Sequence, residues 1–408
     1  MKYFFSTCLT LYSLFNVAYG CTTFIVSGKY TSDGRPLLFK QRDTEMLSNA
    51  LAYFDDGKYK YIAVVDGTKG RDSMVWGGYN SAGFAIINSA AYNMNTSPND
   101  TSSIRDLEGV IMKKALMQCK SVDDFEELLK SLPKPLGADA NFGVVDASGG
   151  AAYFETGNFS FKKFDVNDAI VAPHGFLVRT NHSFSGPLKD GLGYIRYQTA
   201  EAALFEMASN SSFTTENILF NISRSLKHSL TSTNLWNETP LNDSFTNFKC
   251  LVDFIPRHST SSSMLIVGVN QHIKPERTMM WTVLGFPLTT VAIPTWMAGY
   301  NKYPSFLKPN ADHKAPICET GLMLKSKCFS YSYAGGNNYI NLSKVINQKE
   351  TGYLQKIQSI ERPIIAEATR INNLTDGDFQ KGIFDFYQWI EIYLSNKYEK
   401  ELNVSIDK

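Results

Sequence analysis

Short apolar runs broken by turn-forming residues dominate the N-terminal part of the chain. Such runs, rich in β-branched and aromatic residues and bounded by Gly, Asn, Asp or Ser, predict β-strands. They occupy residues 21–27, 36–43, 61–65, 83–88, 142–146, 151–155 and 176–180. The first two flank a Ser-Asp-Gly turn signal at 32–34, so they form a predicted β-hairpin. A second β block covers 262–268 and 278–293, with Pro287 and Pro294 as interruptions.

Apolar residues at helical spacing lie between and after these strand blocks. The periodicity predicts helices over residues 107–119, 122–132, 197–208, 352–372 and 379–397. Ser121 precedes acidic residues and is the expected N-cap of the second helix. In the last one, Ile383, Tyr387, Ile390 and Leu394 share a face, which indicates packing rather than chemistry. Two strand blocks accompanied by helices favour an α+β fold of stacked sheets covered by helices.

Residues 1–20 have the pattern of a secretion signal. Lys2 provides a basic start, residues 3–17 are mostly apolar, and Ala18 and Gly20 are small residues at −3 and −1 of a cleavage site before Cys21. The segment is too short and too interrupted to span a bilayer. A lipoprotein signal also ends at Cys, but Ala18 with the bulky Tyr19 is atypical of it. We therefore expect a cleaved signal peptide and a secreted or periplasmic protein, with lipid anchoring as the competing interpretation.

Size and composition limit the class of protein. Without residues 1–20 the 408-residue chain keeps 388 residues, which exceeds the usual size of one core. After Gly299 the strand-like runs are replaced by a Pro- and Lys-containing connection and two predicted helices. This change predicts a main domain over 21–299 and a largely helical extension over 300–408, packed on that core. The formal net charge of +1 argues against a nucleic-acid-binding surface. Hydrophobic residues make up 43% of the chain and aromatic residues 13%, enough for a large core and compatible with an apolar substrate pocket.

The cysteine count is odd once the leader is removed. Cys21, Cys119, Cys250, Cys318 and Cys328 remain. In an oxidising compartment four of them could pair and leave one free, and the chemistry described next requires Cys21 to be that free thiol. Cys318 with Cys328 is the favoured bridge because the intervening loop is short. Buried, unpaired thiols are the alternative, since sequence does not give disulfide connectivity.

Cleavage between Gly20 and Cys21 would give the new N-terminal residue a thiol and an α-amine on one Cα atom. An α-amine and a thiol have ordinary pKa values close enough to exchange a proton near neutral pH. A nucleophile and a candidate general base are thus supplied by one residue, as in N-terminal-nucleophile amidases. No G-x-S-x-G elbow, H-E-x-x-H, paired C-x-x-C or P-loop offers competing chemistry.

Such an enzyme also needs groups that orient the amine and hold the oxyanion. The second strand of the hairpin carries Lys40, Arg42 and Asp43. Because strands alternate faces, Lys40 and Arg42 share one side, and Asp43 points to the other unless a bulge or the strand end turns it. Asn88 and Asn181 each follow an apolar run, and their side-chain amides could donate to an oxyanion.

Five segments together resemble the linear-amide C-N hydrolase superfamily. They are Cys-Thr-Thr-Phe at 21–24, Asp-Gly-Arg-Pro-Leu-Leu-Phe-Lys-Gln-Arg-Asp at 33–43, Gly-Phe-Ala-Ile-Ile-Asn-Ser at 83–89, the region 141–155, and Arg-Thr-Asn-His at 179–182. The superfamily includes choloylglycine hydrolases, penicillin V acylases and acyl-coenzyme A:6-aminopenicillanic acid acyltransferases. The resemblance runs in order over residues 21–294 and does not extend beyond Gly299.

The resemblance implies a four-layer αββα sandwich and cleavage of a linear, non-peptide amide without metal or cofactor. By position, Cys21 is similar to the family nucleophile and Asp43 to the carboxylate that holds the α-amine. Asn88 and Asn181 are similar to the oxyanion-binding and amine-positioning amides. Arg196 resembles an arginine that supports the site from the following helix.

The chain departs from the bile salt hydrolases at one supporting position. Those enzymes place an arginine three residues before the aspartate, where this chain has Lys40, and Arg42 is adjacent to the aspartate. The resemblance therefore leaves open which cation takes the supporting role, and it does not transfer bile-salt specificity. Asn181-His182-Ser183 matches a glycosylation sequon, which we interpret as accidental because a glycan there would block the site.

The sequence leaves three functional hypotheses open. The first is a hydrolase of small-molecule N-acyl amides, and the second is an acyltransferase; relatives of the second type cut themselves at a Gly-Cys bond, which signal peptidase makes unnecessary here. The third is a lipid-anchored binding protein in which Cys21 is only the anchor. The acyl group, the amine and the oligomeric state are also open, although relatives often form homo-oligomers.

Overall fold

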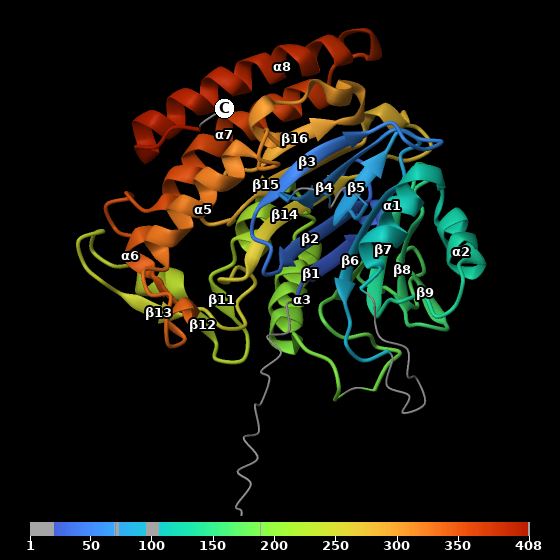
Figure 1. Ribbon diagram of the computed structural model, residues 1–408, viewed down its shortest axis with the longest axis horizontal. Coiled ribbons are helices and arrows are strands. Elements are labelled where there is room, and N and C mark those ends of the chain that lie inside the picture. The colour runs from blue at the N-terminus through green and yellow to red at the C-terminus, as the bar shows by residue number, and fades with distance from the viewer. Residues whose placement is uncertain (1–19, 69, 71–72, 95–105, 188, 407–408) are drawn as a thin grey trace, which may run out of the picture.

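The computed structural model describes residues 20–68, 70, 73–94, 106–187 and 189–406. Two antiparallel sheets form its centre (Figure 1). One has six strands in the order β10-β1-β2-β14-β15-β16. Their bounds are β1 Thr22–Val26, β2 Leu37–Asp43, β10 Phe176–Arg179, β14 Thr260–Val267, β15 Met279–Leu284 and β16 Ile293–Trp296. The sheet therefore joins the predicted hairpin to the second β block.

The other sheet has seven strands that follow one another in chain order from β3 to β9. They are β3 Asn49–Phe54, β4 Tyr61–Asp66, β5 Gly77–Asn80, β6 Ala85–Ala90, β7 Ala140–Val145, β8 Ala151–Thr156 and β9 Phe161–Asp165. The two sheets pack face to face, and the hydroxyl of Tyr153 on β8 donates across the interface to Oγ1 of Thr23 on β1 at 2.9 Å. Two small ribbons pair β11 (Lys227–His228) with β12 (Thr233–Asn234), and β13 (Phe248–Cys250) with β17 (Tyr339–Asn341).

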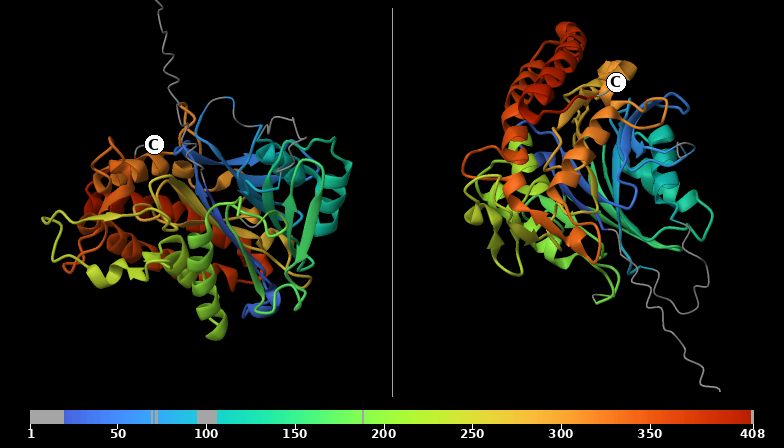
Figure 2. Two further views of the ribbon diagram at one scale, coloured as in Figure 1. Left: turned by 90° about the horizontal axis from the view of Figure 1, so that it is seen from below. Right: turned by 60° about the vertical axis from the view of Figure 1, so that its left-hand side comes forward.

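Helices cover both outer faces. They are α1 Glu108–Gln118, α2 Val122–Ser131, α3 Tyr194–Ser209, α4 Thr215–Ile218, α5 Pro316–Cys328, α6 Leu342–Val345, α7 Tyr353–Asn372 and α8 Asp376–Lys397. The α1–α2 pair lies on the seven-stranded sheet, and α7 and α8 lie at the opposite side of the molecule (Figure 2). The predicted αββα sandwich is confirmed by these layers.

Local sequence explains how α2 begins and which face it buries. The Ser121 side chain accepts a hydrogen bond from the Asp124 backbone amide at 3.1 Å, as predicted for an N-cap. Phe125 on its inner face meets the rings of Phe142 and Phe154 edge-on, with centroids 5.6 and 5.1 Å away. Edge-to-face aromatic packing of this kind stabilises by about 0.5–1.5 kcal/mol beyond the burial itself.

The C-terminal helices share the core of the sheets. Apolar residues of α7 and α8 belong to the same hydrophobic cluster as the strands, among them the predicted face of Ile383, Tyr387, Ile390 and Leu394. Glu361 of α7 pairs with Arg224, and both side chains are fully buried. The predicted boundary at Gly299 lies inside the helical segment Met297–Lys302, and the division into two domains stays a prediction.

One cysteine expectation is wrong. Cys318 and Cys328 both lie in α5, where a rise of about 1.5 Å per residue places them about 15 Å apart along the axis, too far for a disulfide. All five cysteines of the described residues are free thiols. The segment between the two is a helix rather than a loop, which removes the reason for expecting the bridge.

In the part of the chain that the structure describes, none of the helices combines the length and apolarity that crossing a membrane requires.

Candidate active site

Cys21 lies directly before β1, an inner strand that pairs with β10 on one side and β2 on the other. Its side chain is largely buried and borders a cavity of about 350 Å³, which we call the Cys21 cavity. Lys40, Arg42, Asp43 and Asn88 border the same cavity. Four of the six residues expected around the nucleophile are thereby brought to one place.

The Asp43 carboxylate is buried at the end of β2. Thr260 Oγ1 donates to its Oδ1 at 2.6 Å, and Arg257 Nη2 lies 2.8 Å from Oδ2. The register of β2 against β14 shifts next to this pair, which is the irregularity that the alternation argument allowed for Asp43. Burial raises the pKa of Asp43, while the charges of Arg257 and Arg196 act in the opposite direction.

Arg196 supports the first residues of β1 from the opening turn of α3. Its Nη1 donates to the Cys21 carbonyl at 2.8 Å and to Thr22 Oγ1 at 3.1 Å, and its Nη2 donates to Asn181 Oδ1 at 2.6 Å. Burial lowers the pKa of Arg196 to about 9, and the nearby charge of Arg257 adds to the effect. The predicted helix began at residue 197, whereas α3 begins at Tyr194 and so includes Arg196.

Asn181 follows β10 and is fully buried, so its side chain has no room for a glycan in this fold. Its Nδ2 donates to the carbonyl of Ala90 at 2.8 Å, and its Oδ1 is the acceptor for Arg196. Both ends of this amide are therefore engaged. An ideal Cβ atom on Gly20 would lie 2.1 Å from Asn181 Oδ1, so Asn181 lies on the amine side of Cys21.

Asn88 is placed differently, because only one end of its amide is engaged. Lys40 Nζ donates to Asn88 Oδ1 at 2.6 Å and to the carbonyl of Trp76 at 2.8 Å. No acceptor for Asn88 Nδ2 occurs among the described residues, and Asn88 borders the Cys21 cavity. A planar amide held through its oxygen by a cation is a good hydrogen-bond donor, which suits an oxyanion.

The two candidate cations have distinct surroundings. Lys40 is buried and holds Asn88, and burial lowers the pKa of Lys40 to about 8 while the Cys21 side chain acts to raise it. Arg42 instead donates to Asn49 Oδ1 at 2.5 Å and to Asp66 Oδ1 at 2.8 Å, and lies 4.4 Å from the Trp76 ring centroid. Lys40 is therefore the cation that contacts the candidate oxyanion amide.

Sequence reasoning missed Arg257, Thr260 and Trp76. Arg257 sits in a loop before β14, where Pro-Arg-His-Ser matches no motif, and Thr260 belongs to a Ser/Thr run without a distinguishing pattern. Only the strand assignment of 262–268 could have suggested that this region reaches Asp43.

The Cys21 cavity also includes Glu108, whose pKa is raised well above its ordinary value by burial and by a hydrogen bond to Asp106.

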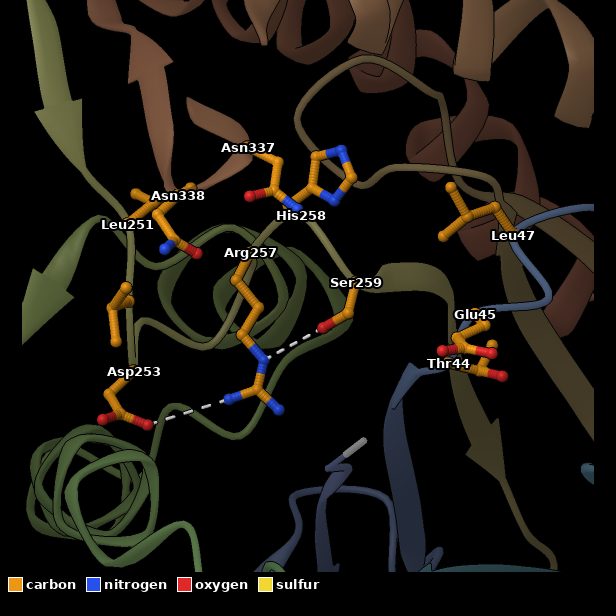
Figure 3. Close-up of a pocket in the computed structure, with 11 residues that line it drawn as sticks. Thr44, Glu45, Leu47, Leu251, Asp253, Arg257, His258, Ser259, Asn337 and Asn338 are labelled. Atoms are coloured by element: carbon orange, nitrogen blue, oxygen red, sulfur yellow. Dashed lines mark hydrogen bonds and ion pairs between the residues drawn. The ribbon is translucent and has the colours of Figure 1, made fainter. Parts of the chain in front are cut away.

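A second cavity of about 450 Å³ adjoins the first, and we call it the Arg257 pocket (Figure 3). Thr44 and Glu45 border both cavities. Most of the residues that line it have polar side chains, among them Asp253, His258, Ser259, Asn337 and Asn338. The Arg257 side chain lies between Asp253 and Ser259, and its Nε donates to Ser259 Oγ at 3.2 Å.

A comparison with curated protein sequences gives no significant match. Among solved structures, the chain is similar to penicillin V acylase from Agrobacterium tumefaciens, with 14% identity and a TM-score of 0.40 over 68% of this chain and 86% of that one. It is also similar to a variant of conjugated bile acid hydrolase from Clostridium perfringens, with 12% identity and a TM-score of 0.39 over 69% of this chain and 94% of that one.

A sequence profile supplies the family. The profile described as acyl-coenzyme A:6-aminopenicillanic acid acyl-transferase matches residues 33–255, which is more than half of the chain. The match includes Asp43, Asn88, Asn181 and Arg196. The resemblance inferred from the sequence motifs is thereby confirmed, and the chain belongs to the acyl-coenzyme A:6-aminopenicillanic acid acyl-transferase family.

Proposed function

We propose that the chain is a secreted amidohydrolase that uses an N-terminal Cys21 to cleave a linear amide of a small N-acyl compound. The observation that carries the proposal is the convergence of separate strands and a helix on the Gly20–Cys21 bond. Arg257 donates to the Gly20 carbonyl and pairs with Asp43. Arg196 donates to the Cys21 carbonyl and to Asn181, and the Cys21 side chain borders the cavity that contains Asn88.

Removal of residues 1–20 would turn the Cys21 nitrogen into an α-amine next to a prepared carboxylate. Asp43 Oδ2 is buried and accepts no well-aligned hydrogen bond from any described residue, although Arg257 is within ion-pair distance. That oxygen can accept a hydrogen bond from the new amine. The amine in turn takes the proton of the Cys21 thiol, which produces the nucleophile.

The reaction then proceeds as acyl transfer. The thiolate attacks the amide carbonyl carbon, a carbon–sulfur bond forms, and Asn88 Nδ2 donates to the developing oxyanion. The carbon–nitrogen bond breaks as the α-ammonium gives its proton to the departing amine. Water, deprotonated by the amine, attacks the thioester and releases the carboxylic acid and the thiol. Removing one such oxyanion donor costs about 10²- to 10³-fold in kcat in other enzymes.

Acyl transfer to a second amine or thiol remains the alternative, because the family to which the chain belongs has the description of an acyltransferase. The two activities differ in product: transfer requires an added acceptor, whereas hydrolysis does not. A lipid-anchored binding protein is disfavoured because Cys21 is largely buried and precedes an inner strand, a poor position for a group that must reach a bilayer.

The test begins with the intact mass and N-terminal sequence of the secreted protein. A start at an unmodified Cys21 supports the proposal, and an acylated Cys21 or another start contradicts it. With N-acyl amides as substrates, Cys21→Ala should abolish turnover and keep the fold. Cys119→Ala is the matched control, since Cys119 is also buried but lies outside the Cys21 cavity. Amidase activity that persists in Cys21→Ala would refute the assignment.

A further inference from the structure

Helix α5 of the C-terminal extension brings a buried lysine to the surroundings of Asp43. The Lys325 side chain is almost inaccessible to solvent. Its Nζ donates to the carbonyl of Thr260 at 3.2 Å and to the carbonyl of His258, and it lies 5.1 Å from the centroid of the Phe286 ring. Lysine is almost never fully buried unless it is paired, and the hydrogen-bond partners of this ammonium group are main-chain carbonyls.

These two carbonyls belong to the turn at residues 257–260. The Thr260 amide donates to the Arg257 carbonyl at 2.8 Å, and the Arg257 amide donates to Thr260 Oγ1 at 3.0 Å, so the turn is closed by its own hydrogen bonds. The Thr44 amide, just beyond β2, donates to the Ser259 carbonyl at 2.9 Å. The turn is therefore fixed to the end of β2 and to α5.

The turn carries two side chains that contact the Asp43 carboxylate. Thr260 Oγ1 donates to its Oδ1, and Arg257 Nη2 lies within ion-pair distance of its Oδ2. A shift of the turn would move both groups together, and a misplacement of about 1 Å can cost about 10²-fold in rate even when its cause is far from the chemistry. The position of the Asp43 carboxylate thus depends on what holds the turn.

Helix α5 also contacts the segment that follows Asp43. The Asn49 amide donates to Cys318 Sγ at 3.3 Å, and Ser48 Oγ donates to Glu319 Oε1 at 2.6 Å. The helix lies beyond residues 33–255, which the family profile matches. The C-terminal extension therefore reaches the chain on both sides of the Asp43 carboxylate, although the family pattern does not include it.

The charge of Lys325 acts on Asp43 as well. It acts to lower the pKa of Asp43, as do Arg257 and Arg196, against the larger effect of burial. Burial also lowers the pKa of Lys325 to about 7, while Asp43 and Cys318 act to raise it. Lys325 is therefore charged at acid pH, where Asp43 takes up its proton. At alkaline pH the neutral amine keeps two N–H donors for the two carbonyls.

We propose that Lys325 is a positioning residue, which fixes the 257–260 turn and thereby the Asp43 carboxylate beside the Cys21 nitrogen. The inference rests on the proposed function, and it gives the C-terminal extension a part in the reaction. Lys325 does not border the Cys21 cavity, so it acts through the turn and through its charge.

A pH–rate profile tests this role in protein that begins at Cys21, with one N-acyl amide as substrate. Lys325→Met should lower kcat about tenfold or more with little change in KM, as expected for lost hydrogen bonds from a charged group. Because ionised Asp43 is the active form and its pKa rises without the nearby positive charge, the acid limb of kcat/KM should move to higher pH. Lys325→Arg keeps the charge and should keep the acid limb in place.

Controls separate the effect on Asp43 from other effects of the substitution. Lys327→Met removes an exposed lysine of the same helix and should leave the profile unchanged. The profile is also measured in a His258→Gln background, because the Lys325 charge adds to the burial that lowers the pKa of His258 to about 4. An acid limb that still moves there belongs to Asp43.

Thermal unfolding shows which variants are folded, and Lys325→Gln replaces Lys325→Met if the latter does not fold. A wild-type acid limb in the folded variant would overturn the proposal, even if kcat falls, because a purely structural role predicts that result. An equal displacement of the limb in Lys325→Arg or in Lys327→Met would also overturn it.

Alkylation of Cys21 by iodoacetamide separates this inference from the proposed function, because it needs no substrate. Peptide mass spectrometry follows Cys21 among the other free thiols. Lys325→Met should slow the reaction, since a displaced Asp43 no longer holds the amine that takes the thiol proton, and Lys327→Met should not. Amide hydrolysis by the wild type, with an acid limb and an alkylation rate that Lys325→Met leaves unchanged, supports the amidase and overturns the positioning role. Slower alkylation in Lys325→Met, with no hydrolysis of any amide by the wild type, supports the positioning role and contradicts the amidase.

Discussion

Replacement of Lys40 tests how the candidate oxyanion amide is held. Lys40→Met removes the ammonium group that donates to Asn88 Oδ1 at 2.6 Å, so the amide loses both its orientation and its polarising charge. A hydrogen bond to a charged group is worth about 1.5–3 kcal/mol, which in the transition state corresponds to a fall in kcat/KM of about 10- to 100-fold. We expect a loss of that size with little change in KM.

The pH dependence provides the sharper signature. Burial lowers the pKa of Lys40 to about 8, with Arg42 acting in the same direction and Cys21, Glu108 and Asp106 acting against it. Because the charged form is the active one, kcat/KM should fall as pH rises through about 8. Lys40→Arg should keep its charge and move this fall to higher pH.

Stability should respond in the opposite sense to activity. The folded-state pKa of about 8 lies below the ordinary value of 10.5, so burying the Lys40 charge costs about 3 kcal/mol below pH 8, and the cost is relieved as pH rises toward 10.5. Lys40→Met removes this cost but leaves Asn88 Oδ1 and the Trp76 carbonyl without their donor, so we expect a small net change in unfolding free energy.

The assay is a pH–rate profile of wild type, Lys40→Met and Lys40→Arg with one substrate, accompanied by thermal unfolding. An unchanged kcat in folded Lys40→Met would show that Lys40 does not position Asn88. An identical alkaline limb in wild type and Lys40→Arg would show that another group causes the loss of activity at high pH.

Two further predictions follow from contacts around the site and the core. If signal peptidase removes residues 1–20 as proposed, Gly20→Ala should be processed as wild type, because alanine suits the −1 position and the mature enzyme would not contain residue 20. Accumulation of precursor, detected by intact mass, would instead indicate self-cleavage impeded by the clash with Asn181. Glu361→Gln should lower the unfolding free energy by about 3–5 kcal/mol, because it leaves the fully buried Arg224 without a compensating charge. A denaturation midpoint equal to that of wild type would contradict this account of the pair.

Strands with continuous apolar runs could be predicted from the sequence, and strands without them could not. The sequence predicted β1, β2 and β14 because both faces of these strands are buried, so that apolar residues follow one another along each of them. β5 reads Gly-Gly-Tyr-Asn and β9 reads Phe-Lys-Lys-Phe-Asp, so neither has the composition of an isolated strand. Both form because neighbouring strands supply the pairing, which is information about tertiary structure.

The residues of the candidate site also fall into those that the sequence predicts and those that only the fold reveals. Cys21 and Asp43 follow from chemical need and a short motif, and Asn88 and Asn181 from their place after apolar runs. Arg257 contacts Asp43 through the fold alone, since no local pattern distinguishes it from other loop arginines. The mistaken cysteine bridge has the same origin. In the sequence the residues between Cys318 and Cys328 look like a short loop, although they belong to the helix α5.

The order of strands in the six-stranded sheet determines at which point of protein synthesis the site can form. Gly20 and Arg257 are 237 positions apart in the chain, and Asp43 and Thr260 are 217 apart. A ribosome must therefore complete more than half of the protein before the carboxylate beside Cys21 can meet its partners. A signal peptidase could remove the proposed leader long before then, whereas a chain that cuts itself would have to wait for β14. The moment at which the leader disappears during synthesis thus distinguishes the two routes to a free Cys21.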